Sequence, residues 1–170
     1  MNTYFDLFEI PVQLKVPKEA IRQKYFALSR QTHPDYFINQ GEEAQQKALD
    51  GSAQLNKAFK TFNDVDETIK YVLTLKGLLT ENEKYELPPP FLMQMLELNE
   101  ELAEAAMDDD ADSRNRVMQS VQQTENEIYE PVKHIIEHYQ EGVTTEKELL
   151  QVKDYYFKKK YIERLKHQFA

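Results

Sequence analysis

Apolar residues recur at a helical period along most of the chain. Between residues 18 and 32, Ile21, Tyr25 and Leu28 are spaced by three or four positions, which places them on one face of a helix. Good helix formers such as Leu, Glu, Gln, Lys and Ala are common, and runs of β-branched residues are almost absent. The pattern predicts an all-α protein. A second apolar stripe, within residues 42–62, consists of Ala44, Ala48, Leu55, Ala58, Phe59 and Phe62.

Start and stop signals place the first helices. Thr3 can cap a short helix that ends before Pro11. The helix over 18–32 must end near His33, because the residue before a proline disfavours the α conformation. Residues 33–41 are therefore predicted to be a loop.

A long helix over 42–62 and a shorter one complete the first domain. The shorter helix is capped by Asp64 or Asp66 and ends at Gly77. Its inward-facing residues are expected to be Ile69, Val72, Leu73 and Leu75.

The second half of the chain predicts a three-helix bundle behind a stiff, proline-rich linker. The helices are expected at 91–107, 113–140 and 145–169, and Pro131 should kink or split the second. The predicted boundaries are 1–77 for the N-terminal domain, 78–90 for the linker and 91–170 for the bundle.

The net charge of −9 is unevenly distributed. Basic and acidic side chains balance over residues 1–76, so the whole acidic excess lies in the second half. Nucleic acid is an improbable class of partner, because phosphate binding needs clustered Lys and Arg. The sequence has no Cys, no apolar stretch long enough to span a membrane and no recognisable targeting segment. No motif for a metal, a cofactor or catalysis is present.

The tripeptide His33-Pro34-Asp35 follows the helix over 18–32 directly. Proline restricts the backbone, so the flanking side chains have little entropy to lose on docking, and Asp35 is suited to pair with an Arg of another protein. The preceding helix carries Lys18, Arg22 and Arg30 on the side away from its apolar stripe, and Lys24 flanks the core. Taken alone, the tripeptide is more often a chance occurrence, and basic residues on a helix are usually only solvated. The tripeptide and the basic helix together favour a protein-binding turn at residues 33–35, called the corner below, beside a basic helix face.

Residues 4–76 resemble a J domain, with Ile21, Tyr25, Leu28 and His33-Pro34-Asp35 at that family's positions. The resemblance implies a helical hairpin with short accessory helices. It also implies that the corner and the basic helix bind a DnaK-type ATPase chaperone and stimulate its ATP hydrolysis, so that the protein is itself no enzyme. A helical enzyme that uses His33 or Asp35 as acid or base is the rival from another class.

The predicted helix over 91–107 has two apolar sides. Phe91, Met95, Leu98 and Leu102 form a stripe that is broad enough to pack against the other two helices. A separate arc combines apolar and acidic residues, which suits a basic partner. Packing of its leucines against the first domain explains the spacing equally well. The arc consists of Leu92, Met93, Leu96, Glu97, Glu100 and Glu104.

The same segment resembles the scaffold-binding helix of the HscB family of co-chaperones, whose FLM-x-x-LEL-x-EEL pattern is intact. The resemblance implies an L-shaped, cytoplasmic protein of bacterial type that delivers an IscU-type iron–sulfur scaffold to an HscA-type chaperone. It assigns scaffold contacts to the arc and to an aromatic residue of the third helix, for which Phe157 is the best match and Tyr155 and Tyr156 are alternatives. A J-domain adaptor for a different client is the other reading.

Overall fold

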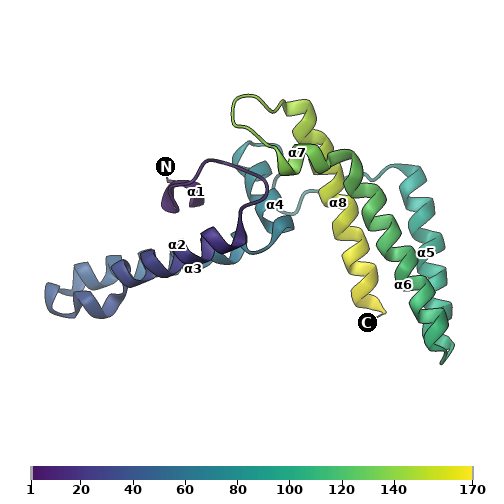
Figure 1. Cartoon of the computed structure of the whole chain (residues 1–170), viewed down its shortest axis with the longest axis horizontal. Helices are drawn as coiled ribbons and strands as arrows, with labels where there is room; N and C mark the ends of the chain where they lie inside the picture. The colour runs from purple at the N-terminus through teal and green to yellow at the C-terminus, as the bar shows by residue number, and fades with distance from the viewer. Residues whose placement is uncertain (1, 170) are drawn as a thin grey trace. The chain divides into compact units, whose positions relative to one another are not determined.

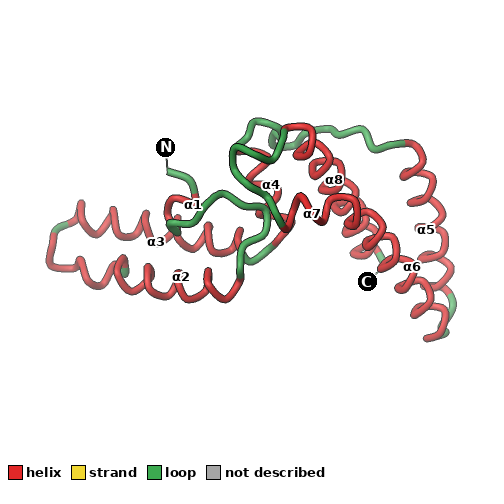
Figure 2. The backbone as a smooth tube through the Cα atoms, turned by 45° about the horizontal axis from the view of Figure 1, so that its top comes forward, coloured by secondary structure: helices red, strands yellow, loops and turns green. Residues whose placement is uncertain are grey.

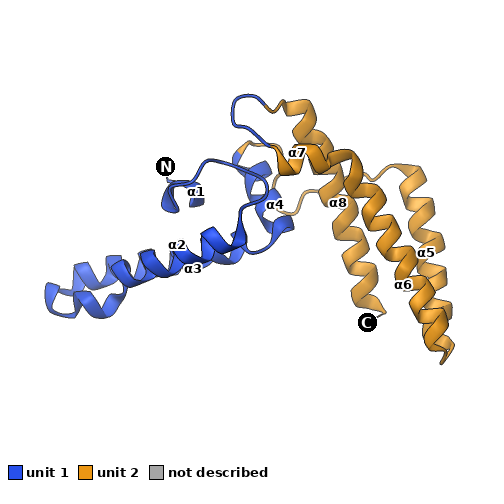
Figure 3. Ribbon diagram, viewed as in Figure 1, with its two compact units in different colours: residues 1–75, 139–143 blue, residues 76–138, 144–170 orange. Residues whose placement is uncertain are grey.

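The computed structural model describes residues 2–169, and within this range it contains helices and loops but no strands (Figures 1 and 2). The fold class expected from the sequence is thus confirmed. The chain forms two compact units (Figure 3). The N-terminal unit consists of Met1–Leu75 with Tyr139–Val143, and the C-terminal unit of Lys76–His138 with Thr144–Ala170.

A helical hairpin forms the body of the N-terminal unit. Helices α2 (Lys18–Thr32) and α3 (Glu42–Phe62) lie side by side in Figures 1 and 2. Between them, the ring of Tyr25 stacks on that of Phe59 with centroids 4.0 Å apart, and the Tyr25 hydroxyl donates a hydrogen bond to Asn56 Oδ1 at 2.7 Å. These contacts fix the register of the hairpin.

Two further helices close the base of this unit. Helix α1 (Tyr4–Leu7) begins with Thr3 in a capping box, and α4 (Val65–Leu75) begins where Asp64 Oδ1 accepts the Glu67 N–H at 3.1 Å. Their apolar faces bury the core of the unit, whose largest fully buried side chains are Phe5, Phe8, Leu14, Ile21, Phe62, Ile69, Val72 and Leu73.

Two expectations for this unit are wrong. Leu75, expected to face inward, is 43% exposed, because it lies about 200° around the helix from the buried Leu73 and is the last residue of α4. The segment expected to be a loop is largely a 3₁₀ helix, η1 (Pro34–Gln40). Gly41, with a φ of 97°, ends this segment in a conformation that favours glycine.

Three long helices build the C-terminal unit. They are α5 (Pro89–Met107), α6 (Ala111–Tyr129) and α8 (Glu146–Gln168). As expected, Pro131 splits the second predicted helix: η2 (Glu130–Val132) and α7 (Lys133–Glu137) follow α6. The shared core contains Phe91, Met95, Leu98, Leu102, Ala105, Val117, Val121, Ile162 and Leu165.

A nearly buried carboxylate joins α6 to α8. The Glu125 side chain is 11% exposed, and its two oxygens lie 2.8 Å from Lys159 Nζ and 3.1 Å from Lys166 Nζ. Burial alone raises the pKa of the Glu125 carboxyl, but the hydrogen bonds from the two lysines outweigh it, so the pKa lies below its ordinary value of 4.5. Ionised Glu125 therefore stabilises the folded unit.

We expect Glu125→Gln to lower the free energy of unfolding by about 1–2 kcal/mol at pH 7, because two ammonium groups lose their nearest counter-charge. Each keeps the more distant Glu163, at 3.6 Å from Lys159 Nζ and 3.5 Å from Lys166 Nζ. A carboxyl whose pKa is lowered by folding stabilises the fold at pH values above its ordinary pKa of 4.5. This contribution is lost as the pH falls through the pKa of the folded state. The difference between wild type and variant should therefore shrink below pH 4.5 in urea unfolding. A difference that stays constant from neutral to acid pH would contradict this role.

Candidate partner-binding surfaces

The corner at His33, Pro34 and Asp35 lies at the start of η1. Pro34 begins the 3₁₀ helix, and His33 Nδ1 accepts the Asp35 backbone N–H at 3.3 Å. This bond holds the backbone of the corner, and Asp35 Oδ2 lies 3.5 Å from the same His33 nitrogen. The Asp35 side chain is 78% exposed and that of His33 53%. An incoming cation can therefore reach the carboxylate without any rearrangement of the fold.

Apolar side chains flank this carboxylate. Tyr36 is 67% exposed and Ile38 is 58% exposed, and the Tyr36 ring meets the His33 ring edge-on with centroids 6.3 Å apart. A docking partner can therefore combine a charge-assisted hydrogen bond to Asp35 with apolar contacts to exposed residues that follow it in the chain.

The three basic residues predicted on α2 differ in their surroundings. Arg22 and Arg30 are exposed, and the Arg22 guanidinium lies 5.8 Å from the centroid of the half-exposed Phe26 ring. Lys24 Nζ lies 3.6 Å from a carboxylate oxygen of Glu9, so part of its charge is already neutralised within the fold. The exposed positive charge of α2 thus resides on Arg22, Arg30 and Lys18, the first residue of the helix.

Helix α5 separates its two apolar sides as the spacing predicts. Phe91, Met95 and Leu98 are buried in the bundle. Leu92, Met93 and Leu96 are 43%, 61% and 54% exposed. The three glutamates of the predicted arc, Glu97, Glu100 and Glu104, are also exposed. An apolar patch therefore continues into an acidic strip on one face of α5.

The apolar patch forms one wall of a groove between α5 and α8, with a volume of about 590 Å³. Met95 and Leu165 belong both to this lining and to the buried core. Helix α8 contributes Tyr161 to the lining, a residue that the sequence did not single out. The lining residues are Pro89, Leu92, Met93, Met95, Leu96, Asn99, Tyr161, Leu165 and Gln168.

Phe157 does not line this groove. Its ring stacks on that of Tyr85, with centroids 4.5 Å apart and an interplanar angle of 6°, and Tyr156 meets it edge-on at 5.2 Å. The two alternatives considered from the sequence, Tyr155 and Tyr156, are 7% and 4% exposed. All three aromatic residues are thus engaged within the C-terminal unit.

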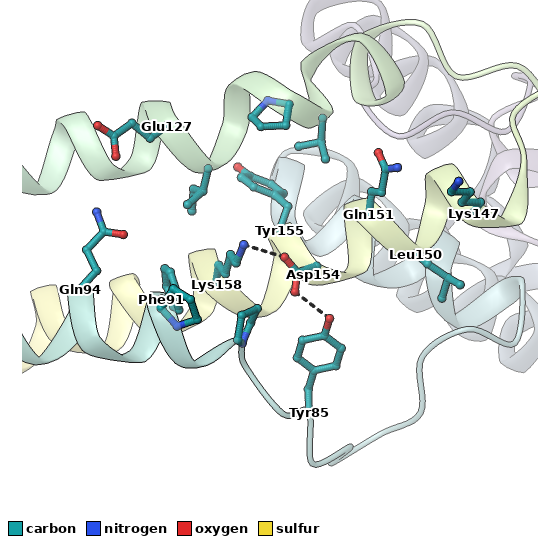
Figure 4. A pocket seen from close by; sticks show the side chains of 15 residues that line it. Tyr85, Phe91, Gln94, Glu127, Lys147, Leu150, Gln151, Asp154, Tyr155 and Lys158 are labelled. Atoms are coloured by element: carbon teal, nitrogen blue, oxygen red, sulfur yellow. Dashed lines mark hydrogen bonds and ion pairs between the residues drawn. The ribbon is translucent and has the colours of Figure 1, made fainter.

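Tyr85 comes from the predicted linker and is fixed on α8. Its hydroxyl donates a hydrogen bond to Asp154 Oδ1 at 2.8 Å, and Asp154 Oδ2 pairs with Lys158 Nζ at 2.8 Å (Figure 4). Burial, the hydrogen bond to Asp154 and nearby negative charge raise the pKa of Tyr85 to about 12. These residues line a second cavity of about 770 Å³, in which Asp154 and Lys158 pair with each other. The contacts of Tyr85 with α8 hold the segment just before α5 and so position the start of that helix.

Two features of the described residues bear on other classes of function. Between residues 2 and 169, no group of three or more His, Asp or Glu side chains lies close enough to hold a metal ion. No helix in this range has an apolar stretch long enough to cross a bilayer.

Comparisons with known proteins relate both units to one family. Residues 87–169 match the family model described as the HSCB C-terminal oligomerisation domain. A co-chaperone protein HscB homologue from Colwellia psychrerythraea is 32% identical over 123 residues, which cover 72% of this chain and 70% of the relative. Homologues from Shewanella halifaxensis and Vibrio cholerae are 36% and 35% identical, over 64% and 58% of their own lengths.

Solved structures extend the likeness over nearly the whole chain. Chaperone HscB from Vibrio cholerae has a TM-score of 0.77 and 27% identity, with 99% of this chain and 95% of that chain covered. Human co-chaperone protein HscB has a TM-score of 0.82 over 99% of this chain and 81% of its own. At 22% identity, the human protein shows a common fold only.

Proposed function

Because the chain belongs to the HscB family, we propose that it is a non-enzymatic co-chaperone of iron–sulfur cluster biogenesis. In this proposal it binds an IscU-type scaffold, delivers it to an HscA/DnaK-type ATPase chaperone and stimulates ATP hydrolysis by that chaperone. One observation carries the proposal: two exposed surfaces of different chemistry lie on two separate compact units. As the likeness to bacterial HscB proteins implies, we place this activity in the cytoplasm.

The N-terminal unit supplies the chaperone-binding surface. Asp35 offers an exposed carboxylate at a corner held by Pro34 and by the hydrogen bond to His33. Arg22 and Arg30 on α2 provide positive charge that steers this unit toward an acidic surface. Binding changes the rate of ATP hydrolysis by favouring one conformation of the chaperone, since no catalytic group is delivered.

The C-terminal unit supplies the scaffold-binding surface. The exposed leucines and methionine of α5 can bury apolar area against a partner, and the glutamates beside them select a basic one. Over residues 91–130 there are 11 acidic and 2 basic side chains, so a partner with a negative surface would be repelled. The apolar patch beside the acidic strip therefore supports an IscU-type scaffold as the partner over a client of unspecified chemistry.

An adaptor works only if one chain holds both partners, because it acts by raising the effective concentration of one partner beside the other. We therefore propose a complementation assay that measures steady-state ATPase turnover of an HscA-type chaperone with the scaffold present. Asp35→Asn keeps the scaffold-binding surface, and the double variant Leu92→Ala/Leu96→Ala keeps the corner. Wild type should give full stimulation, whereas the two variants mixed should give no more than the double variant alone.

Full stimulation by the mixture would show that bridging is unnecessary and would contradict the adaptor mechanism. Stimulation by wild type that is the same with and without scaffold would favour a J-domain adaptor for a different client.

A further inference from the structure

The groove between α5 and α8 is shaped to receive a side chain from outside. Leu92, Met93 and Leu96 stand exposed along one wall, and the floor is made by Met95 and Leu165, which belong to the packed core. A floor of core residues does not move when a ligand enters, so the shape of the groove is preformed.

Tyr161 forms the wall on α8 and is held in place. Its ring meets the buried Phe91 ring edge-on, with centroids 6.1 Å apart, and the Arg164 guanidinium lies 5.9 Å from the Tyr161 centroid. The ring is half-buried, which leaves part of it accessible from the groove. A fixed, partly exposed tyrosine costs little entropy on docking and suits a binding hot spot.

We propose that Tyr161, rather than Phe157, is the aromatic residue of α8 that contacts the scaffold, and that the groove takes one apolar side chain of the scaffold beside a basic residue. This inference rests on the proposed function and names a specificity-determining residue within it. The basic neighbour follows from Glu97 and Glu100, which lie one and four residues beyond Leu96 on the exposed side of α5.

Phe157 is shielded by contacts within the protein. One face of its ring is covered by Tyr85, whose hydroxyl is bonded to Asp154. The rest of the ring is partly exposed, but it does not line the groove. The same linker segment is held by an ion pair of 2.6 Å between Lys153 Nζ and Glu83, with both side chains largely buried. A partner could use the stacked face of Phe157 only after displacing Tyr85 and breaking these bonds. Tyr161 needs no such rearrangement.

The absence of tryptophan from the sequence allows a direct test. Tyr161→Trp and Phe157→Trp each introduce a single position for 5-fluorotryptophan, whose ¹⁹F resonance is followed while unlabelled scaffold is added to the full-length protein. The resonance at position 161 should shift on binding, whereas the resonance at position 157 should stay in place. Each variant keeps an aromatic ring, so the packing of the bundle is retained.

Affinity measurements by calorimetry form the second arm. Tyr161→Ala should weaken scaffold binding about tenfold, Tyr161→Phe should stay within about threefold of wild type, and Phe157→Ala should also stay within about threefold. Circular dichroism checks that Tyr161→Ala is folded. The double variant Leu92→Ala/Leu96→Ala serves as the positive control for loss of the docking face.

The outcomes separate this inference from the function on which it rests. If the double variant abolishes binding but changes at position 161 alter neither the ¹⁹F shift nor the affinity, the role of Tyr161 is overturned and the scaffold-binding function stands. A shift at position 157 alone would overturn it in the same way. If wild type fails to bind the scaffold, the proposed function fails, and the inference with it.

Discussion

Asp35→Asn is expected to reduce stimulation of the chaperone ATPase about tenfold or more, while scaffold binding stays unchanged. The substitution keeps the size of the side chain and the backbone bond to His33 Nδ1, so the corner retains its shape. It removes only the charge. Hydrogen bonds to charged groups contribute about 1.5–3 kcal/mol, and about 1.4 kcal/mol corresponds to a factor of ten. The measurement is the steady-state ATPase rate as a function of co-chaperone concentration.

A matched control comes from the other end of the same unit. Glu67 is an exposed acid on α4, and this helix lies away from the turn that joins α2 to α3 (Figure 1). Glu67→Gln makes the same change of charge. It should leave stimulation within about twofold of wild type, because an isolated exposed charge far from an interface contributes little. Equal losses for both variants would mean that net charge, and not the corner, drives the interaction.

The sequence predicted the helices of the hairpin with the bounds that the structure shows. Helices α2 and α3 begin and end at the expected residues, because Pro17, Pro34 and Gly41 punctuate two strongly periodic segments. The two faces of α5 were predictable for a related reason. One arc is apolar along most of the helix and forms the core side, whereas the other passes from apolar residues into glutamates. The spacing alone left open whether the leucines of the second arc pack against the first domain.

The parts that the sequence missed depend on contacts without a periodic signature. The 3₁₀ helix η1 is held by local bonds, such as that from the Tyr36 N–H to the His33 carbonyl at 3.1 Å, and its residues show no helical stripe. Leu75 is apolar yet exposed, because its position on α4 turns it away from the core, and its hydrophobicity alone does not reveal this.

The aromatic residues of α8 illustrate the same limit. Tyr155, Tyr156 and Phe157 point to different sides of one helix, and Tyr161 lies one turn beyond Phe157 on the same side, so periodicity cannot say which of them borders α5. That choice follows from tertiary packing: Tyr85 occupies the face of Phe157, and the side of α8 with Tyr161 and Leu165 lines the groove. A resemblance between sequences assigns a contact to the residue at the matching position, whereas the contact itself depends on which side chain is accessible in the folded protein.

The double variant Leu92→Ala/Leu96→Ala is expected to weaken scaffold binding on the order of 100-fold. Burial of a leucine side chain contributes about 1.5–3 kcal/mol, and truncation to alanine removes most of that area from the interface, so two truncations cost about 2–4 kcal/mol. Both residues are about half exposed in the free protein. The free energy of unfolding should therefore change by less than about 1 kcal/mol in urea titrations.

Leu150→Ala provides the comparison, because Leu150 on α8 is 45% exposed and lines the other cavity of the same unit. It should bind the scaffold as wild type does. If Leu150→Ala and the double variant weaken binding equally, the effect is general loss of apolar surface and the assigned face is wrong. A salt titration completes the argument: screening of Glu97, Glu100 and Glu104 should slow association with a basic scaffold, while the leucines should mainly set the dissociation rate.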